Sequence, residues 1–187
     1  MKVRWLGNAC TEIFGDEHIL IDPNFVKEPE RKADIVLLTH EHDDHFAVED
    51  YEAFGSGRLF APRTALEKFG VEGTAVEHGD KIGEISVFKS DCWGSEESVS
   101  YLYRGILHTG DSAVFPDTEK VKLIFSACFP NYYDVYIAGA KRLDPELVIP
   151  YHYSPAEALD DARGLKKRLE EEGIQSKILK IGGSIEI

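Results

Sequence analysis

The sequence predicts an α/β protein with two stacked β-sheets that helices cover on their outer faces. Three observations predict this class: two groups of short β-rich segments, helical segments interspersed among them, and apolar runs typical of strands buried on both faces. The chain has 187 residues and a hydrophobic content of 43%, which fits one soluble domain with its own core. We therefore expect a single domain over residues 1–187.

The first third of the chain is expected to begin the first sheet. Its strands should form an antiparallel meander, because turn signals separate three β-rich segments, residues 2–6, 11–15 and 18–22. The apolar run Ile35–Leu38 then predicts a strand buried on both faces. A helix, a strand and a second helix should follow over residues 48–55, 58–61 and 62–70.

The remainder of the chain predicts the second group of strands. These strands are expected over residues 84–90, 98–105, 105–111, 122–127 and 146–152, with a helix over 133–143. A last helix is predicted from Ser154 as N-cap, Pro155 as first helical residue and Glu157 completing a capping box, with Gly173 as its stop. Strands over residues 176–181 and 184–187 should close the sheet.

Composition restricts the partners of the protein. The formal charge of −13, from 34 acidic and 21 basic side chains, repels the phosphate backbone of nucleic acids and favours a small-molecule substrate. No apolar run approaches the ~18 residues that span a bilayer, and no secretory signal is visible, so we expect no membrane association and a cytoplasmic location. Cys10, Cys92 and Cys128 form no CxxC pair and are expected as reduced thiols. The oligomeric state is open.

Histidine and aspartate are concentrated in "LLTHEHDDHF", directly after the apolar run. Side chains alternate along an extended segment, so His40, His42 and Asp44 should point to one side and converge as metal ligands. A turn after them would bring His45 towards a second point, so that two metals could share the loop. The alternative is a charged surface loop without a function.

The motif "THEHDDH" after a buried strand resembles the HxHxDH signature of the metallo-β-lactamase superfamily. Four further stretches fit the order of motifs in that family: "WLGNACTEI", "ILIDP", "LHTGDS" and "VIPYHY". The resemblance covers nearly the whole chain and is strongest for short zinc-dependent hydrolases related to ascorbate-phosphate lactonase. It implies an α/β (α+β) fold arranged as a four-layer αββα sandwich, with a binuclear metal site.

The resemblance also implies the ligands. His40 and His42 would hold the first metal, Asp44, His45 and His152 the second, and Asp111 would bridge them. Asp44 and Asp111 are the candidate catalytic carboxylates, and Asp22 would accept the free ring N–H of a ligand histidine, unless it only marks an Asp-Pro turn. The expected cofactors are two divalent ions, with zinc first and manganese or iron as alternatives. His18, His78 and His108 match no motif position and are expected to be structural or surface residues.

The sequence departs from the family at one ligand. The third histidine of the first metal is absent, and its position falls in "KSDCWGS", at Asp91 or Cys92. A thiolate there would favour zinc, whereas a carboxylate would suit manganese or iron. If neither residue is a ligand, the first site would be weak and the protein would hold one metal.

These features predict a metal-dependent hydrolase that uses a metal-activated hydroxide on an ester, lactone or phosphodiester bond of a small anionic metabolite. One alternative is a metal-binding scaffold that lost turnover together with the third histidine. A less favoured alternative is an RNA-processing nuclease, which the acidic charge and the short chain disfavour. The aromatic residues of segment 129–136 and Trp93 should either line a substrate pocket or pack in the core.

Overall fold

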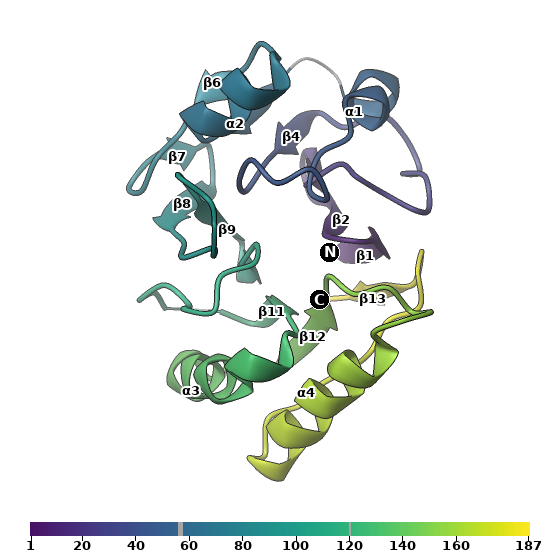
Figure 1. Cartoon of the computed structure of the whole chain (residues 1–187), viewed down its shortest axis with the longest axis vertical. Coiled ribbons are helices and arrows are strands. Elements are labelled where there is room, and N and C mark those ends of the chain that lie inside the picture. The colour runs from purple at the N-terminus through teal and green to yellow at the C-terminus, as the bar shows by residue number, and fades with distance from the viewer. Residues whose placement is uncertain (56–57, 120) are drawn as a thin grey trace. The chain divides into compact units, whose positions relative to one another are not determined.

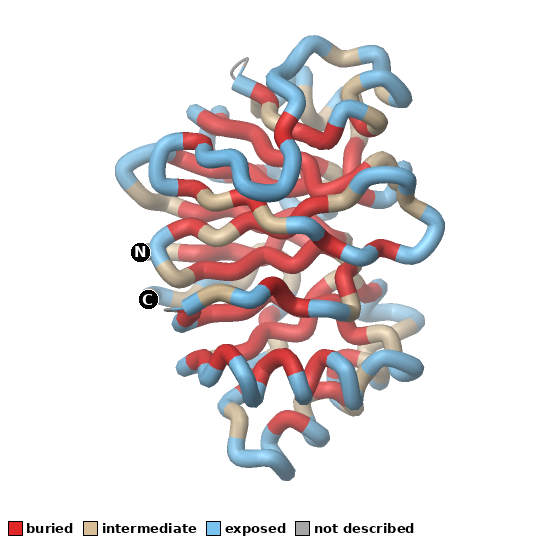
Figure 2. Tube along the Cα trace, turned by 90° about the vertical axis from the view of Figure 1, so that its left-hand side faces the viewer, coloured by how far each residue is buried: buried red, intermediate tan, exposed pale blue. Residues whose placement is uncertain are grey.

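The computed structural model describes residues 1–55, 58–119 and 121–187, which form two compact units (Figure 1). Unit 1 comprises residues 1–76, 94–98 and 179–187, and unit 2 comprises residues 77–93 and 99–178. Each unit contains one β-sheet, and buried residues are concentrated along the strands (Figure 2). The expectation of one domain over residues 1–187 stays a prediction.

Unit 1 contains a seven-stranded sheet in the order β13-β1-β2-β3-β4-β5-β6. Its strands are β1 (Lys2–Gly7), β2 (Cys10–Phe14), β3 (His18–Ile21), β4 (Ile35–Leu37), β5 (Leu59–Ala61), β6 (Thr74–Ala75) and β13 (Ser184–Glu186). The first three strands form the predicted antiparallel meander. From β3 to β6 the neighbours are parallel. The change to parallel pairing places the ends of β3 and β4 at the same edge of the sheet.

The apolar run of β4 explains its central place in unit 1. All three of its residues are buried, and it lies between β3 and β5, as expected for a strand covered on both faces. Helices α1 (Val48–Phe54) and α2 (Arg63–Phe69) follow β4 and β5 in the chain, close to their predicted bounds. Helix α2 ends at Gly70, whose φ of 63° is left-handed and accessible to glycine without strain.

Unit 2 contains a six-stranded sheet in the order β12-β11-β10-β9-β8-β7. Its strands are β7 (Lys81–Ile82), β8 (Ile85–Lys89), β9 (Val99–Tyr103), β10 (Ile106–His108), β11 (Leu123–Ala127) and β12 (Leu147–Tyr151). Strands β7 to β10 are antiparallel ribbons, whereas β10, β11 and β12 are parallel. The five strands predicted for this part of the chain are therefore confirmed, as β8 to β12.

The helices of unit 2 are α3 (Tyr133–Leu143), preceded by the 3₁₀ turn η1 (Pro130–Tyr132), and α4 (Leu159–Glu171). Helix α3 has its predicted bounds. The predicted start of the last helix at Pro155, with Ser154 as N-cap, is wrong, because α4 begins four residues later, at Leu159. The carbonyl of Ser154 accepts the N–H groups of Glu157 and Ala158, at 3.1 and 2.8 Å, and closes a separate turn before the helix.

The predicted strand over residues 176–181 is also wrong. Ser176 makes a single parallel bridge with Val148, and residues 177–181 belong to no strand. The apolar side chain of Leu179 is buried although it lies in a loop, so the apolar residues of this segment reflect burial rather than strand pairing. Within the described ranges, no helix combines the length and the apolar character needed to cross a membrane.

Candidate metal centre

The loop from His40 to His45 in unit 1 gathers three imidazole rings. The centroid of the His40 ring lies 4.5 Å from that of His42 and 4.0 Å from that of His45. The backbone N–H of His45 donates to the carbonyl of His42 at 3.1 Å, which closes the turn between them. Asp44, inside this turn, is exposed. The loop thus offers nitrogen and carboxylate ligands of the kind that zinc, iron and manganese bind.

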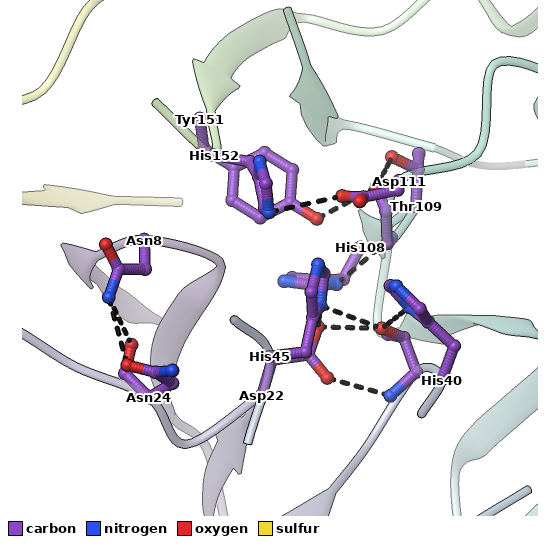
Figure 3. Close-up of polar contacts among 12 residues, drawn as sticks. Asn8, Asp22, Asn24, His40, His45, His108, Thr109, Asp111, Tyr151 and His152 are labelled. Atoms are coloured by element: carbon purple, nitrogen blue, oxygen red, sulfur yellow. Dashed lines mark hydrogen bonds and ion pairs between the residues drawn. The ribbon is translucent and has the colours of Figure 1, made fainter. Parts of the chain in front are cut away.

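Two buried residues, Asp22 and Thr39, orient the rings of His40 and His45. Figure 3 shows Asp22 beside these two rings. The Thr39 hydroxyl donates to Asp22 Oδ2 at 2.8 Å, so its oxygen accepts the Nδ1–H of His40 at 3.0 Å. The Nδ1–H of His45 donates to Asp22 Oδ2 at 2.8 Å. Both rings therefore carry their proton on Nδ1 and present the lone pair of Nε2, which is the tautomer that a metal requires.

The position of Asp22 follows from the parallel pairing of β3 and β4. Asp22 directly follows β3, and its N–H donates to the carbonyl of Leu37 at the end of β4, at 2.9 Å. Its Oδ1 accepts the N–H of Thr39 at 2.7 Å. The backbone of Asp22 is left-handed, with φ of 51°, a conformation that Asp and Asn adopt more readily than other residues with a Cβ atom. Asp22 is therefore more than an Asp-Pro turn residue.

A chain of side-chain amides supports the histidine loop from β1. The Asn24 amide donates to the carbonyl of Asp43 at 2.9 Å. Asn24 is held in turn by Asn8, whose amide donates to the Asn24 carbonyl at 3.2 Å and to its Oδ1 at 3.0 Å (Figure 3). The indole N–H of Trp5 donates to the carbonyl of Asn8 at 2.9 Å. Sequence reasoning missed Asn8 and Asn24. Asparagine is common in turns, and its position in the sequence does not reveal whether its side chain also contacts a distant loop.

Charged residues fix the same loop through Glu41 and Lys68. The Lys68 ammonium donates to the carbonyl of Glu41 and pairs with the Asp43 carboxylate, both at 2.7 Å. The Glu41 carboxylate accepts the Ser95 hydroxyl at 2.8 Å and the N–H of Glu96 at 2.6 Å. Burial raises the pKa of Glu41, but these hydrogen bonds outweigh it and hold the pKa below its ordinary value. Glu41 therefore stays a carboxylate near neutral pH.

Unit 2 brings Asp111 and His152 together at the edge where its parallel strands end (Figure 3). Asp111 follows β10 after Thr109 and Gly110, and His152 directly follows β12. The distance between Asp111 Oδ1 and His152 Nε2 is 3.6 Å, and both side chains are largely buried. The Tyr151 hydroxyl donates to the carbonyl of Gly110 at 2.9 Å, which links the ends of the two strands.

The two candidates for the missing histidine differ in burial. Cys92 is only 8% exposed, whereas Asp91 is exposed and lines a surface pocket of unit 2. The N–H of Asp91 donates to the hydroxyl of Ser112 at 3.0 Å, which fastens this segment next to Asp111. Burial favours Cys92 over Asp91 as a metal ligand.

The other two cysteines are buried thiols with raised pKa values. Burial, followed by the charges of Asp161 and Asp111, raises the pKa of Cys128 to about 12. Burial, followed by the charge of Asp22, also raises the pKa of Cys10 well above its usual value. Only a thiolate is a good ligand, so both residues remain packed thiols. All three cysteines are free, as the sequence predicted.

The histidines outside the motif have structural or surface positions. His18 is buried, and its two ring nitrogens face Glu12 Oε1 at 2.8 Å and the carbonyl of Lys32 at 3.0 Å. His108 is buried in β10, with its ring centroid 4.9 Å from that of Tyr151. His78 is exposed.

The aromatic residues expected near a substrate are divided between the surface and the core of unit 2. Trp93 is 87% exposed and Tyr136 is buried. The ring centroid of Phe129 lies 5.5 Å from that of His152, in an edge-on arrangement. Phe129 of the segment 129–136 is thus in contact with a candidate ligand.

Comparisons with known proteins agree with this arrangement. The family described as the beta-lactamase superfamily domain matches residues 2–125. A UPF0173 metal-dependent hydrolase of Methanosphaerula palustris is 30% identical over an alignment of 226 residues that covers 100% of both chains. Another, from Archaeoglobus fulgidus, is 28% identical over 228 residues, with 100% of this chain and 99% of the relative covered.

Two solved structures show the same fold. A metallo hydrolase from Ignicoccus hospitalis has a TM-score of 0.74 at 18% identity, with 100% of this chain and 98% of that chain covered. A metallo-β-lactamase fold protein from Bacillus subtilis also has a TM-score of 0.74 at 18% identity, with 99% of each chain covered. These two structures confirm the predicted fold, and the family match and the two relatives confirm the prediction of a metal-dependent hydrolase. The chain belongs to the β-lactamase superfamily, as a metal-dependent hydrolase of the metallo-β-lactamase fold.

Proposed function

We propose that this protein holds two divalent metal ions and hydrolyses an ester, lactone or phosphodiester bond of a small anionic metabolite. The observation that carries the proposal is the set of hydrogen bonds at Nδ1 of His40 and His45, because contacts with Thr39 and Asp22 at Nδ1 leave the Nε2 lone pair of each ring available as a ligand. The proposed ligands are His40, His42, Cys92 and Asp111 for the first metal, and Asp44, His45, His152 and the bridging Asp111 for the second.

The topology of each sheet supports this ligand set. In unit 1 the histidine loop and Asp22 follow the parallel strands β4 and β3. In unit 2 Asp111 and His152 follow β10 and β12, which are parallel to the strand between them. In each unit the candidate ligands therefore gather at the edge formed by the C-terminal ends of parallel strands, where α/β proteins usually bind ligands.

When bound, a pair of divalent ions lowers the pKa of water and stabilises negative charge on a substrate oxygen. The chain supplies the positioning and the proton carriers. Asp22 and Thr39 hold the imidazole rings, and Asn24 holds the backbone of their loop. Asp44, which is exposed, can exchange a proton with solvent and deliver it to the leaving oxygen, and Asp111 is the second candidate for this step.

The size and charge of the substrate follow from the chain as a whole. A formal charge of −13 repels an extended polyanion such as RNA. The proposed substrate is therefore a small molecule whose negative charge is balanced by groups within the site. RNA binding that weakens steeply with salt would contradict this choice. A cytoplasmic location stays part of the proposal, since the three cysteines are free thiols.

The proposal is tested by metal analysis and a substrate panel. Protein loaded with zinc, manganese or iron should be assayed against simple esters, lactones, thioesters and phosphodiesters, with bound metal measured in each preparation. We expect hydrolysis of at least one class that is lost on chelation and restored by the metal. Full metal loading without turnover of any class would overturn the proposed reaction.

The metal is predicted to be zinc, because Cys92 rather than Asp91 completes the first site. Replacing Cys92 with serine should lower zinc from two equivalents per chain to about one, since a hydroxyl is a much poorer zinc ligand than a thiolate. The matched variant Asp91→Ala removes the exposed carboxylate of the neighbouring residue and should keep both equivalents. Two metals in both variants would exclude this segment as a source of ligands.

Asn24→Ala is expected to weaken metal binding about tenfold, because the loop backbone at Asp43 loses its support while every ligand remains. The free energy of unfolding should fall by only about 1 kcal/mol, the usual value of one hydrogen bond. Metal dissociation constants and thermal unfolding measure the two effects separately. The exposed residue Asn131 provides the control, since Asn131→Ala should change neither quantity. Unchanged metal affinity in Asn24→Ala would show that the amide only stabilises the fold.

A further inference from the structure

Unit 2 contains a cavity of about 840 Å³ that is lined by none of the ligands proposed above. It opens between the end of β8 and the segment from Val114 to Asp117. One part of its wall is apolar and consists of Phe88, Val114, Phe115 and Pro116. Val114 is 54% exposed, so its side chain is accessible to a bound molecule. The volume lies within the range of about 300–1,000 Å³ that is typical of small-molecule sites.

Ser112, the residue after Asp111, forms hydrogen bonds with two residues of the cavity wall. The hydroxyl of Ser112 accepts the N–H of Asp91 at 3.0 Å and the N–H of Val114 at 3.2 Å, and it donates to the carbonyl of Val114 at 2.7 Å. Asp91 and Val114 both line the cavity. A molecule bound in the cavity therefore lies beside the segment that carries a proposed metal ligand.

Arg142 makes the cavity rigid but does not supply charge to a ligand. Its guanidinium donates to the carbonyls of Phe115 and Pro116, at 2.8 and 3.1 Å, and to the carboxylate of Asp117 at 3.2 Å. These contacts hold the apolar wall in place before any ligand binds. The charges of Arg142 and Asp117 compensate each other.

Lys89 and His78 supply the donors that remain. Lys89 lines the cavity, and its ammonium makes no ion pair within residues 1–55, 58–119 and 121–187. The backbone N–H of Lys89 donates to Nδ1 of His78 at 3.2 Å, so the neutral His78 ring carries its proton on Nε2 and can donate it. The carboxylate of Asp91 also lines the cavity and would repel a second negative charge on a ligand.

We propose that this cavity binds an amphiphilic monoanion, with its apolar body against Phe88 and Val114 and its single acidic group at Lys89 and His78. Such a molecule would be the recognised part of the substrate, and in this respect the inference rests on the proposed function. The shared chemistry is a carboxylate or sulfonate on an apolar chain or ring. Polyphosphates and other multiply charged anions are disfavoured by Asp91.

The test uses 8-anilinonaphthalene-1-sulfonate, an aromatic monoanion that fluoresces in apolar surroundings, and the full-length protein. Wild type should bind the dye. Octanoate should displace it at a concentration at least about threefold lower than that needed with 1-octanol, because only octanoate can form the partly exposed ion pair with Lys89. Lys89→Gln should weaken dye binding about three- to fivefold. Val114→Asp should weaken it by at least about tenfold, because the change places a charge in the apolar wall.

Two controls separate this cavity from the metal site and from unspecific dye binding. Lys122→Gln removes an exposed lysine outside the cavity and should leave dye affinity unchanged. His42→Ala should also leave it unchanged, so a failed metal site and a failed cavity give different results. The inference is overturned if wild type does not bind the dye, if 1-octanol competes as well as octanoate, or if Lys89→Gln and Lys122→Gln behave alike. Unfolding curves establish that Val114→Asp, a change at an exposed position, is folded.

Discussion

Replacing His42 with alanine is expected to remove metal and to lower kcat/KM for any hydrolysed substrate by at least about 10³-fold, because positive charge at the reacting oxygen contributes several kcal/mol. His42 is partly exposed in a loop, so the free energy of unfolding of the metal-free protein should change by less than about 1 kcal/mol. Metal analysis, steady-state kinetics and thermal unfolding after chelation measure the three quantities.

The control for metal content is His78→Ala, which removes an exposed histidine outside the motif and should keep the metal content of wild type. Wild-type metal loading in His42→Ala would contradict the assignment of the loop as a ligand source. Equal metal loss in both variants would indicate adventitious binding to surface histidines.

Asp22→Asn is expected to lower the free energy of unfolding by about 2–4 kcal/mol and to weaken metal binding about 10- to 100-fold. The buried carboxylate accepts hydrogen bonds from the Thr39 N–H, the Thr39 hydroxyl and the His45 ring, and an amide can accept only at its single oxygen. Asparagine tolerates the left-handed backbone at this position, so the change reports on charge and hydrogen bonding rather than on backbone strain.

Asp50→Asn is the matched control for this variant. The Asp50 carboxylate accepts one backbone N–H, from Phe25 at 3.0 Å, and touches no candidate ligand. Its replacement should cost no more than about 1 kcal/mol and leave metal affinity unchanged. If Asp22→Asn retains wild-type metal affinity, Asp22 stabilises the fold without tuning the histidines.

Local pattern predicted most of the fold. The meander of unit 1, the buried strand β4 and helix α3 could be read from apolar periodicity and turn residues, because each depends on neighbours in sequence. The errors concern elements whose bounds or existence depend on contacts that the local pattern does not show. Ser154, Pro155 and Glu157 have the composition of a helix start, yet a turn closed by the Ser154 carbonyl delays α4 to Leu159. Residues 176–181 have the apolar content of a strand, yet after Ser176 no neighbouring strand pairs with them in the described sheets.

The sequence by itself determined the family and the histidine loop, because the ligands from His40 to His45 are contiguous and their spacing follows from the geometry of one short segment. Only the tertiary structure decided what holds those ligands and what lies beside them. Asp22 meets His45 because β3 and β4 are parallel neighbours, and Asn24 reaches Asp43 across 19 positions of the chain. The burial of Cys92 and the cavity wall held by Arg142 likewise arise from segments far apart in sequence. Such contacts leave no periodic pattern, since their cause is the packing of separate strands and loops rather than the geometry of one.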